Sequence, residues 1–460
     1  MVNASFPRAG DRGDEPGVKD GGRKPRQGKS MSYPISASPA GPASIDLREN
    51  ALGILFLFMT VGAFAFRLFV TPDLMNMLMD YTSEGGPFYA KFHLGTYAMG
   101  ATLAIILASR PLILTGEDVG LFRSLVRYVA VLTGLAVYLV LIGQLSAIGF
   151  VIDTYLAAVV AGALLLVQTE QVRRIAATSV LCIMIAGAII AIGEVTVGHR
   201  LMPFTESETA FRATGLSSHP LSLGAHCAVA IGFVPLTRWR IWVKIAAIFV
   251  LFIGCVAAGA RLALMLSTVE ILLLLLFVRW PKLSPRHERQ AKLIAFFATI
   301  FVGSVLAVLL LSVGLLSRFS SVVDDNSMAR VRIYEVFNHV SWNDILFGMN
   351  SADLLRIVNE KVGLPFIESA PVIIIMLQGL PAAIFFTIVV ARYILRILRG
   401  APIAAKIGAA TFILVDLSNN ALANKTPDII LLTILIIGLR GAIRSGPVPA
   451  EGPQRAVLRA

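Results

Sequence analysis

The chain has 460 residues, of which 56% are hydrophobic and only 15% are charged. Its mean hydropathy is +0.77, whereas soluble domains are typically about 25% charged, so a soluble enzyme is excluded. The formal net charge of +12 would suggest nucleic acid in a soluble protein. Here most basic residues lie between apolar segments, where lysine and arginine set membrane topology and meet anionic lipid. We therefore expect no nucleic-acid site.

The cysteine and histidine content argues against a disulfide framework or a metal centre. Cys182, Cys227 and Cys255 all fall inside apolar segments, without the spacing of a disulfide or metal-binding pattern. Six histidines in the whole chain are few for a histidine-ligated metal. We expect neither a metal nor a cofactor.

Residues 1–48 differ sharply from the rest, being rich in Gly, Pro, Ser, Lys and Arg. Such a segment buries too little apolar surface to fold alone, so we expect a disordered, basic cytoplasmic tail. A long polar tract precedes the first apolar segment, and no cleavable signal peptide is predicted. Met31 is an alternative start.

Twelve apolar segments follow the tail, and a helix needs roughly 20 apolar residues to cross a hydrocarbon core about 30 Å thick. The fourth, sixth and eleventh are short or carry polar residues. The pattern predicts an all-α polytopic membrane domain over 49–445 and a second cytoplasmic tail over 446–460. The expected spans are about 50–70, 89–109, 128–149, 154–169, 175–197, 219–236, 241–260, 262–279, 293–316, 370–391, 407–423 and 428–443.

The distribution of charge predicts the orientation. If the amino terminus is cytoplasmic, every even-numbered span returns to a basic side, as at Arg173 and Arg174. The first outer loop, TPDLMNMLMDYTSEGGPF, holds three acidic residues and no basic one. Arg67, near the outer end of the first span, is a small exception. The positive-inside rule thus predicts a multi-pass protein of the bacterial inner membrane with both termini in the cytoplasm.

Two predicted periplasmic segments, about 198–219 and 317–369, carry arginines on the side that the rule disfavours. Arg261, in AGARLALML, opens the eighth span at the same side. Arginine presents a planar fork that suits phosphate oxygens, and an arginine at the membrane edge is costly and indicates function. The alternative for Arg261 is snorkelling to the interface, and for Arg318 and Arg356 a solvated loop face. Several such arginines together favour a pyrophosphate site.

Four segments resemble, in order, spacing and sidedness, elements of the bacterial O-antigen polymerase and O-antigen ligase superfamily: FRATGLSSHPLSLG, GARLALMLSTVEILL, MARVRIYEVFNHVSWNDILFGMN and FIESAPVIIIMLQGLPAAIFF. The resemblance covers about residues 180–390. Ala260 stands where the family often has serine, and Asn350 where a second glycine is usual. The ligases resembled here carry a histidine at the membrane re-entry, where this chain has Glu368 and Ser369. That departure favours a polymerase over a ligase.

The resemblance implies a membrane glycosyltransferase of about twelve spans, with a large periplasmic loop between the ninth and tenth. Its reaction would transfer glycan, without a metal, from a polyprenyl-pyrophosphate carrier to a sugar hydroxyl, in exopolysaccharide or O-antigen biosynthesis. The implied partners are the lipid-linked oligosaccharide, membrane lipids, and other polysaccharide assembly and chain-length proteins. Because pyrophosphate is already a good leaving group, the protein has mainly to stabilise charge and orient the reactants.

Under this interpretation, the pyrophosphate is bound by Arg212, Arg261 and either Arg330 or Arg332, with Arg200 as a lesser candidate. Arg330 and Arg332 are two positions apart, so one helix face cannot present both equally. We expect one of them to be catalytic and the other structural.

Two residues near the predicted outer rim, His219 and Glu368, are candidates for the base that accepts the proton of the acceptor hydroxyl. Each has a structural alternative. His219 precedes Pro220 and fits a helix start with a local hydrogen bond, whereas Glu368 can pair with a loop arginine.

Other polar residues in or beside the spans are expected to have structural roles. Ser217 and Ser218 fit an N-cap before Pro220 rather than a nucleophile, because no base with an orienting group is apparent beside them. His226, inside the sixth span, fits a packing residue whose hydrogen bonds are satisfied, and Glu194 fits either a cavity lining or a buried ion pair. Three residues are expected to form interhelical hydrogen bonds: Asp416, Asn419 and Asn420.

The rival functions are an O-antigen ligase, a lipid-linked oligosaccharide flippase or other transporter, and a non-catalytic assembly subunit. Transporters often have two related halves and polar, broken spans near the midplane. No half-to-half repeat is evident, and the polar residues gather in the predicted outer loops. A loop of about 50 residues also favours an enzyme, since long loops are usually functional.

Overall fold

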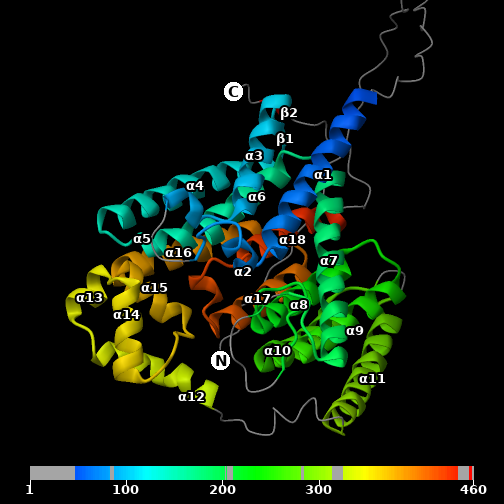
Figure 1. Cartoon of the computed structure of the whole chain (residues 1–460). Helices are drawn as coiled ribbons and strands as arrows, with labels where there is room; N and C mark the ends of the chain where they lie inside the picture. Colours follow the sequence, from blue (N-terminus) through cyan, green and yellow to red (C-terminus); the bar gives the residue numbers. More distant parts are fainter. Residues whose placement is uncertain are drawn as a thin grey trace, which may run out of the picture. The chain divides into compact units, whose positions relative to one another are not determined.

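The computed structural model of the chain describes residues 47–82, 87–202, 204, 211–280, 284–312, 325–443 and 455–457. Apart from Leu47, these belong to the second of two compact units, Arg48–Ala460, which is mostly helical (Figure 1). Nearly all of the predicted tail at 1–48 lies outside the described residues. So do parts of both predicted periplasmic segments and most of the tail at 446–460.

Six stretches of helix in the described part are long and apolar enough to cross a membrane. They are α1 (Leu47–Phe69), α4 (Glu117–Leu141), α7 (Glu170–Val197), α9 (Ile241–Ala258), α16 (Leu380–Ile397) and a continuous run through α5 (Leu145–Phe150), the π-helical turn η2 (Val151–Leu156) and α6 (Ala157–Leu166). Three apolar helices are shorter: α3 (Leu94–Ser109), α8 (Pro220–Phe233) with η3 (Val234–Leu236), and α18 (Asp428–Leu439). The expected helical fold with membrane-length segments is confirmed, and twelve crossings stay a prediction.

The remaining elements connect these helices or complete the bundle. The helices are α2 (Pro72–Asn76), η1 (Phe88–Lys91), α10 (Arg261–Phe277), α11 (Pro285–Ser312), α12 (Asp325–Arg332), η5 (Ile333–Asn338), α13 (Trp342–Phe347), α14 (Ser351–Ile357), η6 (Val358–Val362), α15 (Ala370–Gln378), α17 (Ile403–Leu417), η7 (Ala421–Ala423) and η8 (Arg440–Ile443). Two short strands, β1 (Ile113–Thr115) and β2 (Arg455–Val457), pair antiparallel with Ile113 opposite Val457. This pair is a small addition to the expected all-α fold.

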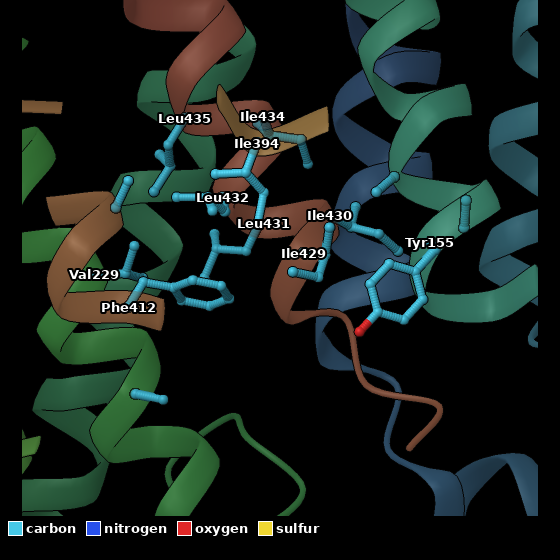
Figure 2. Close-up of a cluster of buried hydrophobic side chains, with 14 of the residues drawn as sticks. Tyr155, Val229, Ile394, Phe412, Ile429, Ile430, Leu431, Leu432, Ile434 and Leu435 are labelled. Carbon is cyan, nitrogen blue, oxygen red and sulfur yellow. The ribbon is translucent and has the colours of Figure 1, made fainter. Parts of the chain in front are cut away.

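Helix α18 forms the centre of the bundle. All of its 12 residues are buried, and it packs against α6, α7 and α8. Figure 2 shows its side chains pointing in several directions, with Phe412 of α17 on one side and Tyr155 of η2 on another. A helix of this length rises about 18 Å, well short of a hydrocarbon core of about 30 Å. Asp428, its first residue, is fully buried, so the helix begins within the packed protein.

The expected span 370–391 is broken in two. Helix α15 ends at Gln378, and α16 begins after Gly379, whose φ is +82°. A Cβ on Gly379 would collide with the carbonyl of Leu346, and one on Gly348 would lie 2.9 Å from the carbonyl oxygen of Leu377. The two glycines thus let the end of α13 lie directly against the break. The Met349 N–H, just beyond, donates to the Met376 carbonyl at 2.7 Å.

A buried polar cluster joins α1, α3 and η2. The Asp153 carboxylate, which is fully buried, accepts hydrogen bonds from the His93 amide at 3.0 Å, the Tyr81 hydroxyl at 3.0 Å and the Thr96 hydroxyl at 2.8 Å. Arg67 donates to the carbonyl of Asp153 at 2.9 Å and to two carbonyls just before α18. Arg67, the one exception to the charge pattern of the first span, is therefore a buried structural residue.

His93 makes the stability of this cluster pH-dependent. Its Nδ1 accepts from the Gly95 amide at 2.9 Å, and its Nε2 lies 3.0 Å from the Val70 carbonyl oxygen, which suits a neutral ring. A proton on Nδ1 would remove the acceptor of the buried Gly95 amide, and a buried donor without an acceptor is costly, so acid is expected to weaken the cluster.

We therefore expect the apparent melting temperature of the detergent-solubilised protein to fall between pH 7 and pH 4. His93→Asn keeps an oxygen that can accept from the Gly95 amide but does not titrate. The variant should show a shallower decline over the same range, whatever its melting temperature at pH 7. Parallel declines in the variant and the wild type would contradict this assignment.

Candidate functional site

The segment 211–219 lies against the turn between α9 and α10. The Ala213 amide donates to the Ala257 carbonyl at 3.2 Å, and Arg212 Nε donates to the Ala258 carbonyl at 3.1 Å. Helix α9 ends at Ala258 and α10 begins at Arg261. Arg212 and Arg261, which are distant in sequence, are thus both placed at this turn. The first turn of α10 adds partial positive charge from its amide groups.

Glu194, in the last turn of α7, holds the segment in place. Its carboxylate accepts from the amides of Thr214 and Gly215, each at 2.8 Å, and from the Leu201 amide at 2.8 Å. The side chain is buried. Glu194 was expected either to line a cavity or to form a buried ion pair. Its hydrogen bonds show neither, because three backbone N–H groups occupy both carboxylate oxygens. Burying a carboxylate requires such partners.

Arg200 supports the backbone of Arg212. Its Nε donates to the Arg212 carbonyl at 2.9 Å. Its guanidinium carbon lies 4.1 Å from the ring centre of Phe204 and 5.1 Å from that of Phe211, which are cation–π distances. The structure thus brings Arg200 to Arg212, and these contacts are those of a supporting group.

His219 is the N-cap of α8. Its Nδ1 accepts from the Leu221 amide at 3.0 Å, and Pro220 occupies the first helical position. The expected N-cap role of Ser217 and Ser218 is therefore wrong, because the histidine ring supplies the acceptor itself. The local hydrogen bond that sequence analysis left as the alternative for His219 is present.

Arg330 and Glu368 lie together, on different segments of the late part of the chain. Arg330 Nε, in α12, is 3.1 Å from Glu368 Oε2, just before α15, and both side chains are partly exposed. Arg332 instead donates to the Val362 carbonyl at 2.8 Å, at the end of η6. The two arginines therefore have different partners. Arg330 contacts a candidate base, and Arg332 contacts backbone.

The Glu368 segment is tied to the end of α17. The Ala370 amide donates to the Asn419 carbonyl at 3.1 Å, and the Asn420 side chain donates to the Ile367 carbonyl at 3.2 Å. One turn earlier, Asp416 is fully buried, and neither of its oxygens has a hydrogen-bond partner among the described residues. The Asn420 bond thus joins two loops rather than two helices, and the expected interhelical hydrogen bond is not found for Asp416 among the described residues.

Sequence analysis missed a hydrogen-bonded chain that runs from the 211–219 segment into the bundle. Ser217 Oγ is 3.0 Å from His226 Nδ1, and His226 Nε2 is 2.7 Å from Asp428 Oδ1. The three residues are 5%, 3% and 0% exposed. His226 is therefore the buried and hydrogen-bonded residue that was expected, but its two partners were not predicted. Ionisable residues inside a membrane domain usually pair, but Asp428 is 202 residues away and no local spacing connects the two.

An apolar cleft of about 500 Å³ opens between η5, α13 and the α15–α16 break. Its walls include Phe337, Val340, Trp342, Ile345, Ile375 and Leu380. It begins a few residues after Arg330, on the same run of helix. A cleft with mainly apolar walls suits the apolar part of a ligand.

In the part of the chain that is described, no three His, Cys, Asp or Glu side chains are grouped closely enough to hold a metal ion. A comparison with protein-family models and with curated protein sequences finds no match for this chain. The described part of the chain holds three groups of polar side chains that can act on a ligand. They are Arg212 and Arg261 at the α9–α10 turn, the Arg330–Glu368 pair and the Ser217–His226–Asp428 chain.

Proposed function

We propose that the protein is a membrane polysaccharide polymerase. It transfers glycan from a polyprenyl-pyrophosphate carrier to an acceptor sugar hydroxyl at the periplasmic face of the inner membrane, in exopolysaccharide or O-antigen biosynthesis. The observation that carries the proposal is the docking of Arg212 onto the α9–α10 turn, beside the helix that begins with Arg261. Two of the expected pyrophosphate ligands thus belong to one local structure.

The chemistry of the reaction fits this arrangement. When the sugar–phosphate bond breaks, negative charge grows on the departing pyrophosphate, and fixed cationic donors stabilise that charge more in the transition state than in the ground state. Arginine binds phosphate oxygens through two parallel N–H groups, and a helix N-terminus also favours an anion. Arg330, held by Glu368, supplies a further cation in the proposed site.

In the proposed function, the apolar cleft binds the lipid part of the donor. An isoprenoid chain is flexible and purely apolar, and walls such as Phe337 and Ile375 give it the contacts that it would otherwise have with membrane lipid. In this arrangement the pyrophosphate lies toward Arg330 and the tail toward the α15–α16 break.

A transporter of lipid-linked oligosaccharide is the second candidate, and one observation favours it. Sequence analysis placed the polar residues mainly in outer loops, yet Glu270 and Asp416 are fully buried within α10 and α17. Buried acidic residues and broken or short helices are common in proton-coupled transporters. Here the short helices are α8, α15 and α18.

One experiment separates these functions. The purified protein in lipid nanodiscs and in sealed vesicles is given a defined polyprenyl-pyrophosphate-linked repeat unit. A polymerase lengthens the glycan in both settings, with release of polyprenyl pyrophosphate. A ligase requires a separate acceptor, such as a lipopolysaccharide core, and adds glycan to it. A transporter changes only the leaflet in which the vesicle-bound substrate is found. Leaflet exchange without any covalent product would overturn the polymerase proposal.

A further inference from the structure

The reaction proposed above releases a proton from the acceptor hydroxyl, and neither base expected from the sequence is arranged to take it alone. Glu368 is held by Arg330 at 3.1 Å. His219 uses Nδ1 to cap its own helix. By contrast, His226 has a carboxylate on one ring nitrogen and a hydroxyl on the other. That is the connectivity of a base with an orienting group.

We propose that Ser217, His226 and Asp428 form a proton relay that accepts the proton of the acceptor hydroxyl during glycan transfer. The inference rests on the proposed polymerase function. An ionised Asp428 can only accept, so the 2.7 Å contact assigns the ring proton to His226 Nε2. Nδ1 then carries the lone pair and accepts the Ser217 hydroxyl at 3.0 Å. The three groups have the roles of a Ser-His-Asp triad, in which Nε2 usually faces the serine and Nδ1 the aspartate. Here the two ring nitrogens are exchanged, with Nδ1 facing Ser217 and Nε2 facing Asp428.

The position of Ser217 argues for more than a structural link. His226 and Asp428 alone would suffice to connect α8 with α18, which are packed together. Ser217 lies outside both helices. It belongs to the segment 211–219, which also contains Arg212 and the N-cap His219. The relay therefore runs from the buried Asp428 to the segment that carries a proposed pyrophosphate ligand.

The acceptor O–H bond breaks, and its proton moves to Ser217 Oγ while the Ser217 proton moves to His226 Nδ1. The electron pair left on the acceptor oxygen forms the new bond to the anomeric carbon of the donor. The bond from that carbon to the pyrophosphate oxygen breaks, and the pyrophosphate leaves with its electron pair. Asp428 offsets the charge of the imidazolium, and the proton returns through Ser217 to the pyrophosphate or to water.

The test compares Ser217→Ala, His226→Gln and the double variant with Ser218→Ala, a matched change at the adjacent serine. Each full-length protein is assayed in nanodiscs with the polyprenyl-pyrophosphate-linked repeat unit. We expect kcat to fall about a hundredfold or more in Ser217→Ala and in His226→Gln, the size of a lost general base, with KM nearly unchanged. The double variant should be no slower than the slower single variant, because groups that act as a unit are non-additive.

A second measurement keeps the test independent of folding. An acceptor sugar whose hydroxyl is made more acidic by a neighbouring fluorine needs less help from a base. It should recover part of the rate of His226→Gln relative to the wild type, which a merely damaged structure would not do.

The outcomes are distinct. Wild-type polymer formation with unchanged kcat in both single variants would overturn the relay alone. So would a loss of rate that the more acidic acceptor does not reduce. Absence of covalent turnover by the wild type, in the same nanodiscs, would overturn the polymerase function and the relay with it.

Discussion

Arg261→Ala is expected to lower polymer formation about 100- to 1000-fold, the cost of removing one preorganised donor to a developing negative charge. Arg261 opens α10, at the turn onto which Arg212 docks. Arg261→Lys keeps the charge but not the planar fork, so we expect an intermediate rate. The measurements are turnover of the lipid-linked repeat unit in nanodiscs and polymer chain length in complemented null cells at equal protein levels.

Arg356→Ala is the matched control, because Arg356 lies in the same late part of the chain but is 60% exposed and pairs with Asp353 on its own helical turn. We expect normal polymer from it. Full-length polymer from all three of Arg212→Ala, Arg261→Ala and Arg330→Ala would rule out the pyrophosphate site proposed here. Because Arg212 also bonds the Ala258 carbonyl, its variant should lose some thermal stability as well.

Asp153→Ala is expected to destabilise the fold rather than to slow a reaction. The substitution removes the acceptor of two buried donors, the His93 amide and the Tyr81 hydroxyl, and of the partly buried Thr96 hydroxyl. Each unsatisfied buried donor costs about 1–3 kcal/mol, so the loss is about 2 kcal/mol or more. Proteins are stable by only about 5–15 kcal/mol. The measurements are the yield of monodisperse protein in detergent and its apparent melting temperature.

Asp353→Ala removes a carboxylate from an exposed ion pair, which is worth at most about 1 kcal/mol, and it should melt within a few degrees of the wild type. Asp153→Asn keeps one acceptor oxygen and should fall between the two. If Asp153→Ala gave wild-type yield and melting temperature, the buried cluster would not be the link between α1, α3 and η2 that its hydrogen bonds indicate.

The helical content was predictable because a run of apolar residues has few other structures open to it in a membrane. The breaks were harder to predict. Hydropathy does not distinguish an apolar helix that faces lipid from one surrounded by other helices, so α18 was expected to be a full span although it is a short buried helix. Gly379 and Pro381 did carry a signal, since a glycine with a proline two residues later often marks the end of one helix and the start of another.

The site was predictable where residue chemistry alone singled out a position. Arg330 and Glu368 were each singled out, and their pairing was one of two alternatives for Glu368. The Ser217–His226–Asp428 chain was missed because its parts come from a loop and two helices that only the tertiary fold brings together. His219 was singled out both as a base and as a helix start, and its N-cap bond is a local interaction.

The contact between Gly348 and Gly379 has a consequence for how the protein can move. A break between two helices is where a bundle bends most easily, but backbone from the end of α13 fills this one and is bonded to it through Met349. Bending at Gly379 must therefore carry α13 along. Since α13 and α15 both line the apolar cleft, and α15 begins two residues after Glu368, the width of the cleft and the position of the Glu368 carboxylate are mechanically coupled.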